Sequence, residues 1–277
     1  MKIIKGAGGI KLAWTEIIAL IMVIFCLGFM AGHFINGSDE YKGLGEPKEI
    51  PLNTYDMSAF KHNKANRVVY KGDDHDYIHV VDVSYVQKDI NWDKVAADNI
   101  DMAMIRLGYR GYSTGLLNLD EYFEVNTEDA EAAGMTYGVY FFSQAVSVEE
   151  AQEEAKFVLK NIKGKKVKGP VAFDMEPIVG ADRITHLTVQ EKTEIADAFL
   201  KIIKKKGYKA MLYGNPSWFK KDVDLKLLTD YPIWLAHYTE RTEWPYMFEM
   251  WQYTSTGRVK GIAGDVDLSI CLIDGRN

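Results

Sequence analysis

The chain has 277 residues, of which 47% are hydrophobic and 26% are charged, and its formal net charge is −6. A chain of this length and composition can bury one core of ordinary size. The acidic balance argues against nucleic acid as the main partner, because contacts to phosphates need a basic surface. The charge does not bear on the binding of uncharged ligands.

The sequence contains two cysteines, Cys26 and Cys271, and we expect no disulfide between them. No C-x-x-C pair or cluster of cysteine and histidine indicates a zinc site. We therefore predict neither a bound metal nor a cofactor.

Near the N-terminus, three lysines precede an uncharged apolar run from Ile17 to Met30, and weaker apolar character continues to Ile35. At about 1.5 Å per residue, the stretch from 17 to 35 nearly crosses a hydrocarbon layer of about 30 Å. We expect a basic cytoplasmic tail over 1–14 and a transmembrane signal-anchor helix over 15–35, with the rest of the chain outside the cell. The alternatives are a cleaved signal peptide, which would release a secreted protein, and a buried soluble helix.

Residues 36–74 are rich in glycine, proline and polar side chains and show no sustained period, which predicts a linker or stalk. Within this segment, Val68, Val69 and Tyr70 could pair with the following domain as an extra strand. The folded domain is then expected over 75–277.

From His75 onward, strand-like and helix-like segments alternate. This alternation predicts an α/β fold with a parallel sheet, either an open doubly wound sheet or a β/α barrel. The chain lacks a G-x-G-x-x-G or phosphate-loop motif, which disfavours the nucleotide-binding versions. Ser147 and Glu150 are spaced as a capping box. The expected strands are 77–83, 102–107, 137–142, 171–174, 209–213, 232–236 and 249–253, and the expected helices are 92–99, 121–133, 148–162 and 188–206.

Acidic residues recur at the ends of the expected strands. Asp82 and Asp174 each close a strand, and Asp267 lies near the end of the chain. In a β/α barrel the carboxyl ends of the strands meet on one face, where active sites lie.

The segment PVAFDMEP over 170–177 places Asp174 and Glu176 on the same side of a strand end, because successive side chains alternate. Repulsion between two close carboxylates raises the pKa of one of them. Glycoside hydrolysis needs this combination of one protonated acid and one ionised group. Two other interpretations are a solvated turn and a calcium or magnesium site.

Seven segments, taken in chain order, resemble the family 25 glycoside hydrolases, the Chalaropsis-type lysozymes. The resemblance implies an irregular TIM-like (β/α) barrel that hydrolyses the β-1,4 bond between N-acetylmuramic acid and N-acetylglucosamine in peptidoglycan. The segments are VVDVSYVQKDINW (80–92), MIRLGYRGY (104–112), AGMTYGVYFFSQA (133–145), VAFDMEP (171–177), GYKAMLYGNPSW (207–218), PIWLAHY (232–238) and MWQYTSTGRVKGIAGDVDLS (250–269).

The resemblance also implies roles for individual residues. Glu176 matches the general acid, and Asp174 matches the carboxylate that stabilises the oxocarbenium- or oxazolinium-like centre. Asp82 and Asp267 match two further active-site aspartates. The residues expected to line the glycan groove are Tyr140, Trp234, Tyr238, Gln252 and Arg106.

The sequence thus predicts a membrane-tethered peptidoglycan muramidase with a monomeric catalytic domain over 75–277. One alternative is a peptidoglycan-binding protein on the same fold that does not cut. The other is a hydrolase of a different N-acetylhexosamine polymer, such as chitin.

Overall fold

The computed structural model describes residues 41–181 and 183–274. From Gly43 onward the chain forms one compact unit. The predicted cytoplasmic tail over 1–14 and the predicted transmembrane helix over 15–35 lie outside the described residues. Among the residues that are described, no helix is long and apolar enough to span a bilayer.

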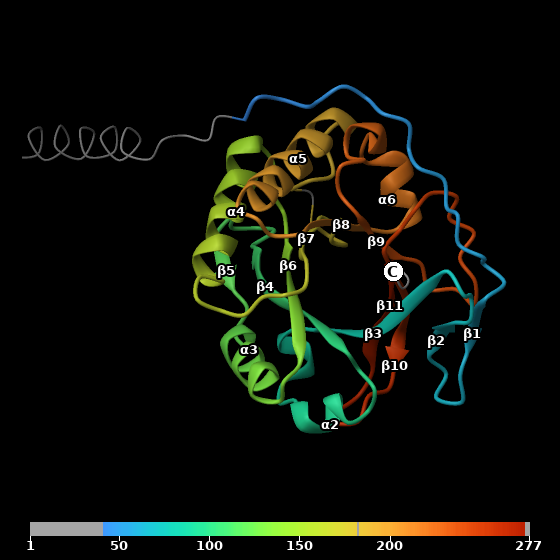
Figure 1. Ribbon diagram of the computed structural model, residues 1–277. Coiled ribbons are helices and arrows are strands. Elements are labelled where there is room, and N and C mark those ends of the chain that lie inside the picture. The colour runs from blue at the N-terminus through green and yellow to red at the C-terminus, as the bar shows by residue number, and fades with distance from the viewer. Residues whose placement is uncertain (1–40, 182, 275–277) are drawn as a thin grey trace, which may run out of the picture. The chain divides into compact units, whose positions relative to one another are not determined.

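Eight strands form a closed, barrel-like sheet (Figure 1). A pairing between the strands β3 and β4 closes the ring. A short ninth strand, β5 (Leu117–Leu119), pairs with the carboxyl-terminal end of β4. Around the barrel the order is β3 (His75–Val83), β11 (Val266–Asp274), β10 (Met250–Gly257), β9 (Ile233–Ala236), β8 (Ala210–Gly214), β7 (Val171–Asp174), β6 (Thr136–Phe142) and β4 (Met102–Arg110).

Neighbouring barrel strands run parallel except at β11, which is antiparallel to both β10 and β3. The predicted α/β class is therefore confirmed, and of the two predicted architectures the sheet is barrel-like. The expectation of an entirely parallel sheet is wrong for β11, a strand that the sequence reading did not identify.

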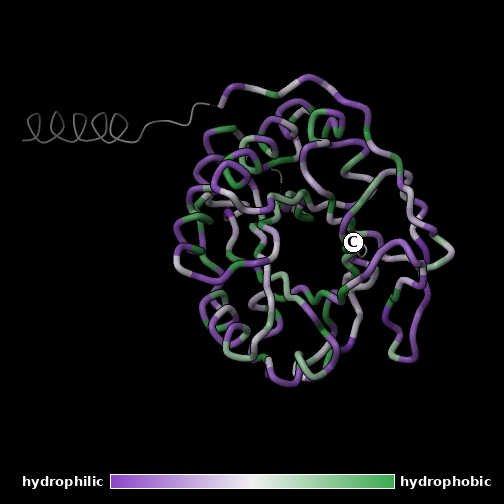
Figure 2. Tube along the Cα trace, viewed as in Figure 1, coloured by the Kyte–Doolittle hydropathy of each residue, from purple (hydrophilic) through white to green (hydrophobic). Residues whose placement is uncertain are grey.

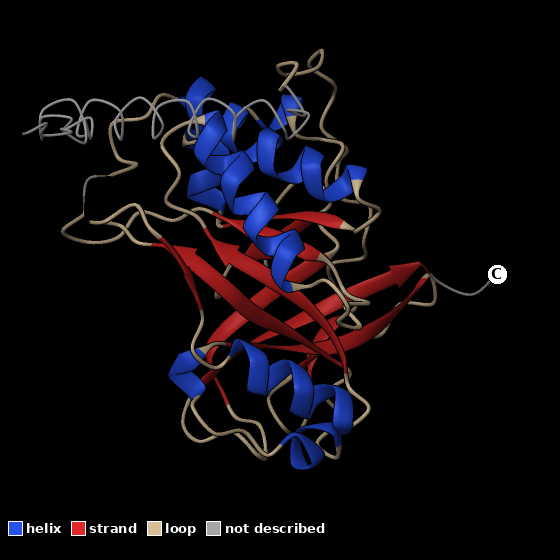
Figure 3. Cartoon of the chain, turned by 90° about the vertical axis from the view of Figure 1, so that its left-hand side faces the viewer, coloured by secondary structure: helices blue, strands red, loops and turns tan. Residues whose placement is uncertain are grey.

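Helices cover two opposite sides of the barrel (Figure 3). The helices α2 (Trp92–Ala96) and α3 (Phe123–Ala132) lie on one side. The helices α4 (Val148–Asn161), α5 (Val189–Lys205) and α6 (Pro216–Lys221) lie on the other. Two short 3₁₀ turns, Tyr85–Gln87 and Leu225–Leu227, complete the helical structure of the described chain.

The caps differ in one respect from the prediction. Thr188 and Glu191 form a full capping box at the start of α5. At α4, Ser147 caps the helix by accepting from the backbone N–H of Glu150. The carboxylate of Glu150, however, accepts from the N–H of Val146 (2.9 Å), so the expected capping box is incomplete.

On the barrel side formed by β10 and β11, the N-terminal segment takes the place of a helix. Trp251 on β10 points outward and is nonetheless fully buried, because the ring of Phe60 packs against it at 5.6 Å. The Tyr55 ring lies 5.2 Å from that of Phe248, and its hydroxyl donates to the Phe248 carbonyl (2.8 Å). The segment thus supplies the apolar cover that this side of the sheet needs.

Backbone and ionic contacts fix the same segment to the domain. The N–H of Asn53 donates to the Pro245 carbonyl (2.9 Å), and an ion pair joins the largely buried side chains of Arg67 and Asp98. The strand β2 (Val68–Tyr70) pairs with β1 (Phe60–His62) in a separate two-stranded sheet, and not with the barrel as the sequence suggested. Residues 43–74, which were predicted to be a linker, therefore pack as part of the folded unit.

The barrel interior is filled in layers by side chains from alternate strand positions. Hydrophobic residues dominate the strands, and polar residues the outer loops (Figure 2). The layers at the starts and in the middle of the parallel strands are apolar and include Met102, Met104, Ala172, Met211 and Met250. Polar side chains replace them at the carboxyl ends of the parallel strands, where the next positions on the same inner face are acidic.

Candidate active site

The strand register brings the four predicted acidic residues to one end of the barrel. Asp174 ends β7, Asp82 is the last inward position of β3, and Glu176 follows two residues after Asp174. Asp267 lies near the start of β11, directly opposite Asp82. Because β11 runs antiparallel, its start lies at the barrel end where the other strands finish. Asp267 therefore lies in the site near the beginning of its strand, and not at the end of a strand as expected.

Asp174 and Glu176 form a pair of carboxyl groups in which Asp174 is buried and Glu176 is partly exposed. Asp174 is 5% exposed, and its Oδ1 accepts no hydrogen bond from the described residues. Burial raises the pKa of Asp174 well above its ordinary value, and repulsion from Glu176 and Asp82 adds to the rise. Burial also raises the pKa of Glu176, with a contribution from Asp267. The pair therefore holds a proton under conditions in which ordinary carboxylates have lost theirs.

Gln252 connects the other two acids. Its Nε2 donates to Asp82 Oδ2 (3.1 Å) and to Asp267 Oδ2 (3.3 Å). Burial, together with repulsion from Asp267, raises the pKa of Asp82 to about 8. Burial raises the pKa of Asp267 to about 6. Gln252 is itself fully buried, so it holds the carboxylates in place and does not line an open groove as predicted.

Two aromatic residues that the sequence assigned to the groove lie deeper than expected. Trp234 is 1% exposed, and its indole N–H donates to Ser269 Oγ (3.0 Å), which lies on β11, two strands away in the sheet. It offers no free face to a sugar, which corrects its predicted role. Tyr140 is 9% exposed, packs against Trp234, and makes a hydrogen bond to Asp82.

Tyr213 is a site residue that sequence reasoning missed. On β8 it pairs in register with both Asp174 and Trp234, and its hydroxyl donates to Gln252 Oε1 (2.9 Å). The sequence did contain a signal, because Tyr213 is the last residue of an expected strand, as Asp174 is of another. The predicted Tyr238 lies at the rim, 52% exposed, and donates to the same oxygen of Gln252 (2.9 Å).

Arg106 points into the same end of the barrel. Its Nε donates to Asp120 Oδ2 (2.7 Å), and Nη2 lies 2.7 Å from the same oxygen. The guanidinium lowers the pKa values of Asp82 and Asp174, which burial otherwise raises. Asp120, whose side chain is fully buried, anchors Arg106 and was not identified from the sequence.

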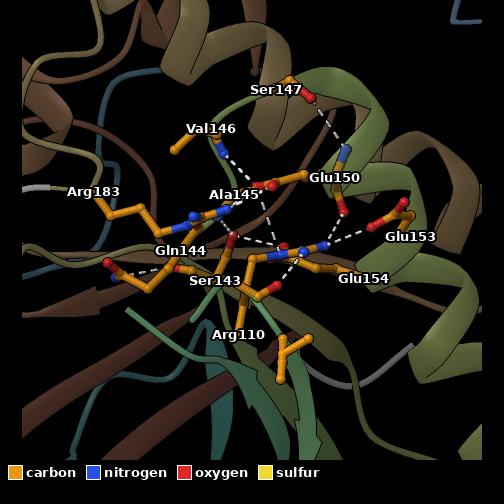
Figure 4. Close-up of polar contacts among 12 residues, drawn as sticks. Arg110, Ser143, Gln144, Ala145, Val146, Ser147, Glu150, Glu153, Glu154 and Arg183 are labelled. Atoms are coloured by element: carbon orange, nitrogen blue, oxygen red, sulfur yellow. Dashed lines mark hydrogen bonds and ion pairs between the residues drawn. The ribbon is translucent and has the colours of Figure 1, made fainter. Parts of the chain in front are cut away.

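A polar network fixes the backbone beside the carboxylate pair (Figure 4). Gln144 Nε2 donates to the carbonyl of Glu176 (2.8 Å), and Arg183 Nε donates to the carbonyl of Gln144 (2.7 Å). Arg183 Nη2 also contacts both carboxylate oxygens of Glu150, at 2.5 and 2.6 Å. Arg183 therefore ties the loop after β7 to the start of α4.

The network continues into the barrel wall. Ser143 donates its N–H to the Asp174 carbonyl (2.6 Å) and its hydroxyl to the buried Glu154 (2.6 Å). Arg110 Nε donates to the other oxygen of Glu154 (2.7 Å). Burial raises the pKa of Glu154 to about 7, although Ser143 and Arg110 lower it. These residues come from a strand, a loop and a helix that are far apart in the sequence, so no local motif reveals them.

Within the described chain, no group of three or more His, Cys, Asp or Glu residues has the arrangement of a metal site. A hollow of about 640 Å³ opens elsewhere, at the amino-terminal ends of the strands, between Tyr55, Lys209 and Cys271. It lies at the far end of the barrel from the acidic cluster, which remains the candidate site.

A barrel mouth that holds two mutually repelling carboxyl groups has the chemical equipment of a glycosidase. The family model described as "Glycosyl hydrolases family 25" matches residues 81–262, and the chain belongs to this family. It is a glycoside hydrolase.

The chain is also similar to named proteins, one of which is a lysozyme. The chain is 26% identical to the uncharacterized protein YegX of Escherichia coli strain K12 over 197 residues, which cover 70% of this chain and 69% of YegX. It is 27% identical to lysozyme M1 of Streptomyces globisporus over 199 residues, 68% of this chain and 65% of the lysozyme.

Among solved structures, the fold is similar to that of the modular autolysin LytC of Streptococcus pneumoniae, solved with a synthetic peptidoglycan ligand. The TM-score is 0.64 at 24% identity, and the match covers 81% of this chain and 52% of LytC. The chain thus spans about half the length of that autolysin, and the likeness concerns the fold.

Proposed function

We propose that the protein is a peptidoglycan muramidase that hydrolyses the β-1,4 bond between N-acetylmuramic acid and N-acetylglucosamine. The observation that carries the proposal is the Asp174–Glu176 pair, with raised pKa values, at the mouth of a family 25 barrel. Lysozyme M1, a relative that matches over most of the domain, supports the choice of peptidoglycan as substrate.

In this proposal Glu176 protonates the leaving oxygen, because it is the more accessible member of the pair. Asp174 stabilises the positive charge that develops at the sugar, either on the ring carbon or on a ring closed by the N-acetyl group. The developing cation favours an ionised Asp174, so the shared proton resides on Glu176 when the bond breaks. The two groups then have the distinct protonation states that the reaction needs.

Asp82 and Asp267 set the charge and hydrogen bonding around this pair. The pKa of about 8 at Asp82 keeps its carboxyl group protonated near neutral pH, so that it can donate a hydrogen bond. Gln252 and Tyr140 orient that group from two sides. This arrangement limits the negative charge at the mouth and leaves Asp174 as the group that meets the cation.

The test is product analysis on purified peptidoglycan with the full chain. New reducing ends on N-acetylmuramic acid support the proposal. Reducing ends on N-acetylglucosamine, or cleavage of chitin with peptidoglycan left intact, would replace it with another hexosaminidase activity. Binding without cleavage would make the protein a non-catalytic wall-binding protein.

Glu176→Gln is the matching variant, because it keeps the shape of the side chain and removes the proton. We expect at least a 10²-fold loss of cleavage, the usual scale for general acid catalysis. Glu128→Gln on the exposed face of α3 is the control and should cut like the parent. Cleavage by Glu176→Gln at the parental rate would refute the assignment of the acid.

We further propose that the domain lies outside the cell, tethered by the apolar segment 15–35. The support is the sequence alone, namely the uncharged run from Ile17 to Met30 after three lysines. Membrane fractionation followed by protease treatment of intact cells tests the proposal. Full-length protein in the membrane fraction, degraded from outside, supports a tether; a shortened protein in the medium supports a cleaved signal instead.

A further inference from the structure

A hollow of about 470 Å³ lies on the β4 side of the barrel mouth, lined by residues of β4, of β6 and of the loops beside them. This volume lies within the range of about 300–1,000 Å³ that is usual for small-ligand sites. The hollow is adjacent to the acidic cluster, because Phe142 of its wall pairs in register with Asp174, and Ile178 follows two residues after Glu176. Three tyrosines supply the remaining aromatic surface of the wall: Tyr85, Tyr109 and Tyr112.

A bulge in β4 places this aromatic wall on the inner side. The register with β6 shifts between Arg106 and Gly108, so that Arg106 pairs with Tyr140 and Tyr109 pairs with Phe142. A β-bulge inserts one extra residue into a strand. Without it, positions 106 and 109 would point to opposite faces of β4. At Gly108 a Cβ would lie 2.2 Å from the Asn118 carbonyl oxygen, so the bulge needs glycine there.

The wall is held rigidly by buried contacts. The guanidinium of Arg106 lies 4.8 Å from the Tyr85 ring centre and 5.4 Å from that of Tyr109. Asp120, 2% exposed, pairs with Arg106 and also accepts from the N–H of Tyr85 (3.2 Å). Tyr85 and Tyr112 are nevertheless 45% and 53% exposed. Tyr85 is thus a fixed aromatic surface in contact with solvent, which is the form of a preorganised binding surface, and Tyr112 adds a second exposed ring to the same wall.

The charges of the wall select an uncharged occupant. Asp120 neutralises Arg106, and Glu154 neutralises Arg110, so the two cations of the lining are already paired. The lining also includes the exposed acid Glu121, which repels anions. Peptides that carry free carboxylates would need unpaired cations here. Sugar rings, which are neutral and have an apolar face, match tyrosine surfaces of this kind.

We propose that Tyr85, Tyr109 and Tyr112 form a stacking subsite for sugar residues of the glycan strand beyond the two that flank the cut bond. This inference rests on the proposed muramidase function. The subsite binds the polysaccharide backbone and not its peptide stems. It thereby gives the enzyme a preference for long strands over short ones.

The test measures binding to the full chain carrying Glu176→Gln, so that nothing is cut. The probes are glycan strands stripped of their stem peptides, with the lactyl carboxyl groups that this frees converted to amides so that the strands stay uncharged, and, separately, the free stem peptides. Replacing Tyr112 or Tyr85 by Ala should weaken binding of the bare strands about tenfold, equivalent to about 1.4 kcal/mol. Tyr112→Trp should retain binding, because it keeps an aromatic face. Leu116→Ala is the control, since Leu116 is exposed in the same hairpin and does not line the hollow.

Kinetics on the otherwise unaltered enzyme give a second readout. Tyr112→Ala should lower the ratio of kcat/KM on long strands to that on the shortest cleavable oligosaccharide by about tenfold. Bare strands that bind both Ala variants as tightly as the parent would overturn the subsite, as would stem peptides that compete with the strands. A parent enzyme that cuts no peptidoglycan would instead overturn the proposed function, so the two failures are distinguishable.

Discussion

Asp82 and Asp267 lie directly opposite each other on the antiparallel strands β3 and β11, and the single amide of Gln252 donates to both. Both side chains are partly shielded from water at the barrel mouth, and repulsion between them contributes to the raised pKa of Asp82. One amide group cannot neutralise two ionised carboxylates. The pair therefore favours states in which at least one of the two acids keeps its proton.

The stability of the fold should accordingly respond to Asp82 in a pH-dependent way. The folded-state pKa of about 8 lies above the ordinary value of 3.8, so this group stabilises the fold most below about pH 4 and loses that contribution as the pH rises through 8. Asp82→Asn cannot ionise. We expect it to raise the free energy of unfolding at pH 9 by at least about 1 kcal/mol, because each unit of pKa shift corresponds to about 1.4 kcal/mol.

Denaturant unfolding at pH 5 and pH 9 measures this effect. The gain of Asp82→Asn over the parent should be larger at pH 9, while its hydrolytic activity falls more than tenfold. Asp129→Asn, on the exposed face of α3, should show neither change. An equal or larger gain at pH 5 would mean that Asp82 is not held protonated in the folded protein.

Gln252→Glu should be among the most damaging isosteric changes in the barrel. It removes the donor that Asp82 and Asp267 share and places a third buried carboxyl group between them. We expect activity at pH 7 to fall at least 10²-fold and the melting temperature to drop more at pH 8 than at pH 5. Gln252→Met, which removes the hydrogen bonds without adding charge, should show no such pH trend. A melting temperature of Gln252→Glu that is independent of pH would contradict this account.

Local patterns were sufficient to predict the pair at the centre of the site. Alternation along one strand placed Asp174 and Glu176 together, and the strand–helix rhythm placed Asp82 at the same end. The helix expected over 92–99 ends instead at Ala96, since Asn99 adopts a positive φ of 56°. Errors of this size follow from local turn geometry and did not affect the site.

The residues that could not be predicted depend on long-range geometry. Alternation shows that Trp234 faces inward, but its depth below the mouth depends on the register of all eight strands. The contacts of Gln144 and Arg183 to the backbone near Glu176 join loops that no motif connects. The packing of Tyr55 against the barrel depends on the gap in helical cover beside β10, which only the closed sheet reveals.

Arg183 should act as a positioning residue for Glu176. Its side chain clamps the loop after β7 to Glu150 and to the carbonyl of Gln144, which in turn holds the Glu176 carbonyl. We expect Arg183→Met to lower kcat about tenfold while KM changes less than about threefold, and to shift the pH profile of kcat. Arg183→Lys should recover only part of the activity, because it cannot contact both partners in the same geometry.

A double-mutant cycle separates this role from general stability. Glu150→Gln should lower kcat in the same way, and its combination with Arg183→Met should cost little more than either change alone. Strictly additive losses, or a lower melting temperature without any change in the pH profile, would show that Arg183 stabilises the loop without positioning the acid.

The N-terminal segment should be required for folding from about residue 43 onward. Deletion of residues 1–42 leaves every contact described for Tyr55, Phe60 and Arg67 in place. Deletion of 1–74 exposes Trp251 and removes Arg67 from the largely buried Asp98, which then keeps only the exposed Lys260 as an ion-pair partner. Burial of one large apolar side chain contributes about 1.5–3 kcal/mol, so the longer deletion removes much of the stability of a typical domain.

Point variants test the same idea without truncation. Tyr55→Ala should lower the free energy of unfolding by about 3 kcal/mol, because it empties a packed aromatic site and removes the hydrogen bond to the Phe248 carbonyl. Leu52→Ala, at a side chain that is 65% exposed, should change it by less than about 0.5 kcal/mol. If Tyr55→Ala and the 1–74 deletion both unfold like the parent, residues 43–74 are a linker in solution. If only the deletion of 1–42 is tolerated, the folded domain begins some 30 residues earlier than the alternation of strands and helices indicates, because the sheet there needs a cover that no helix supplies.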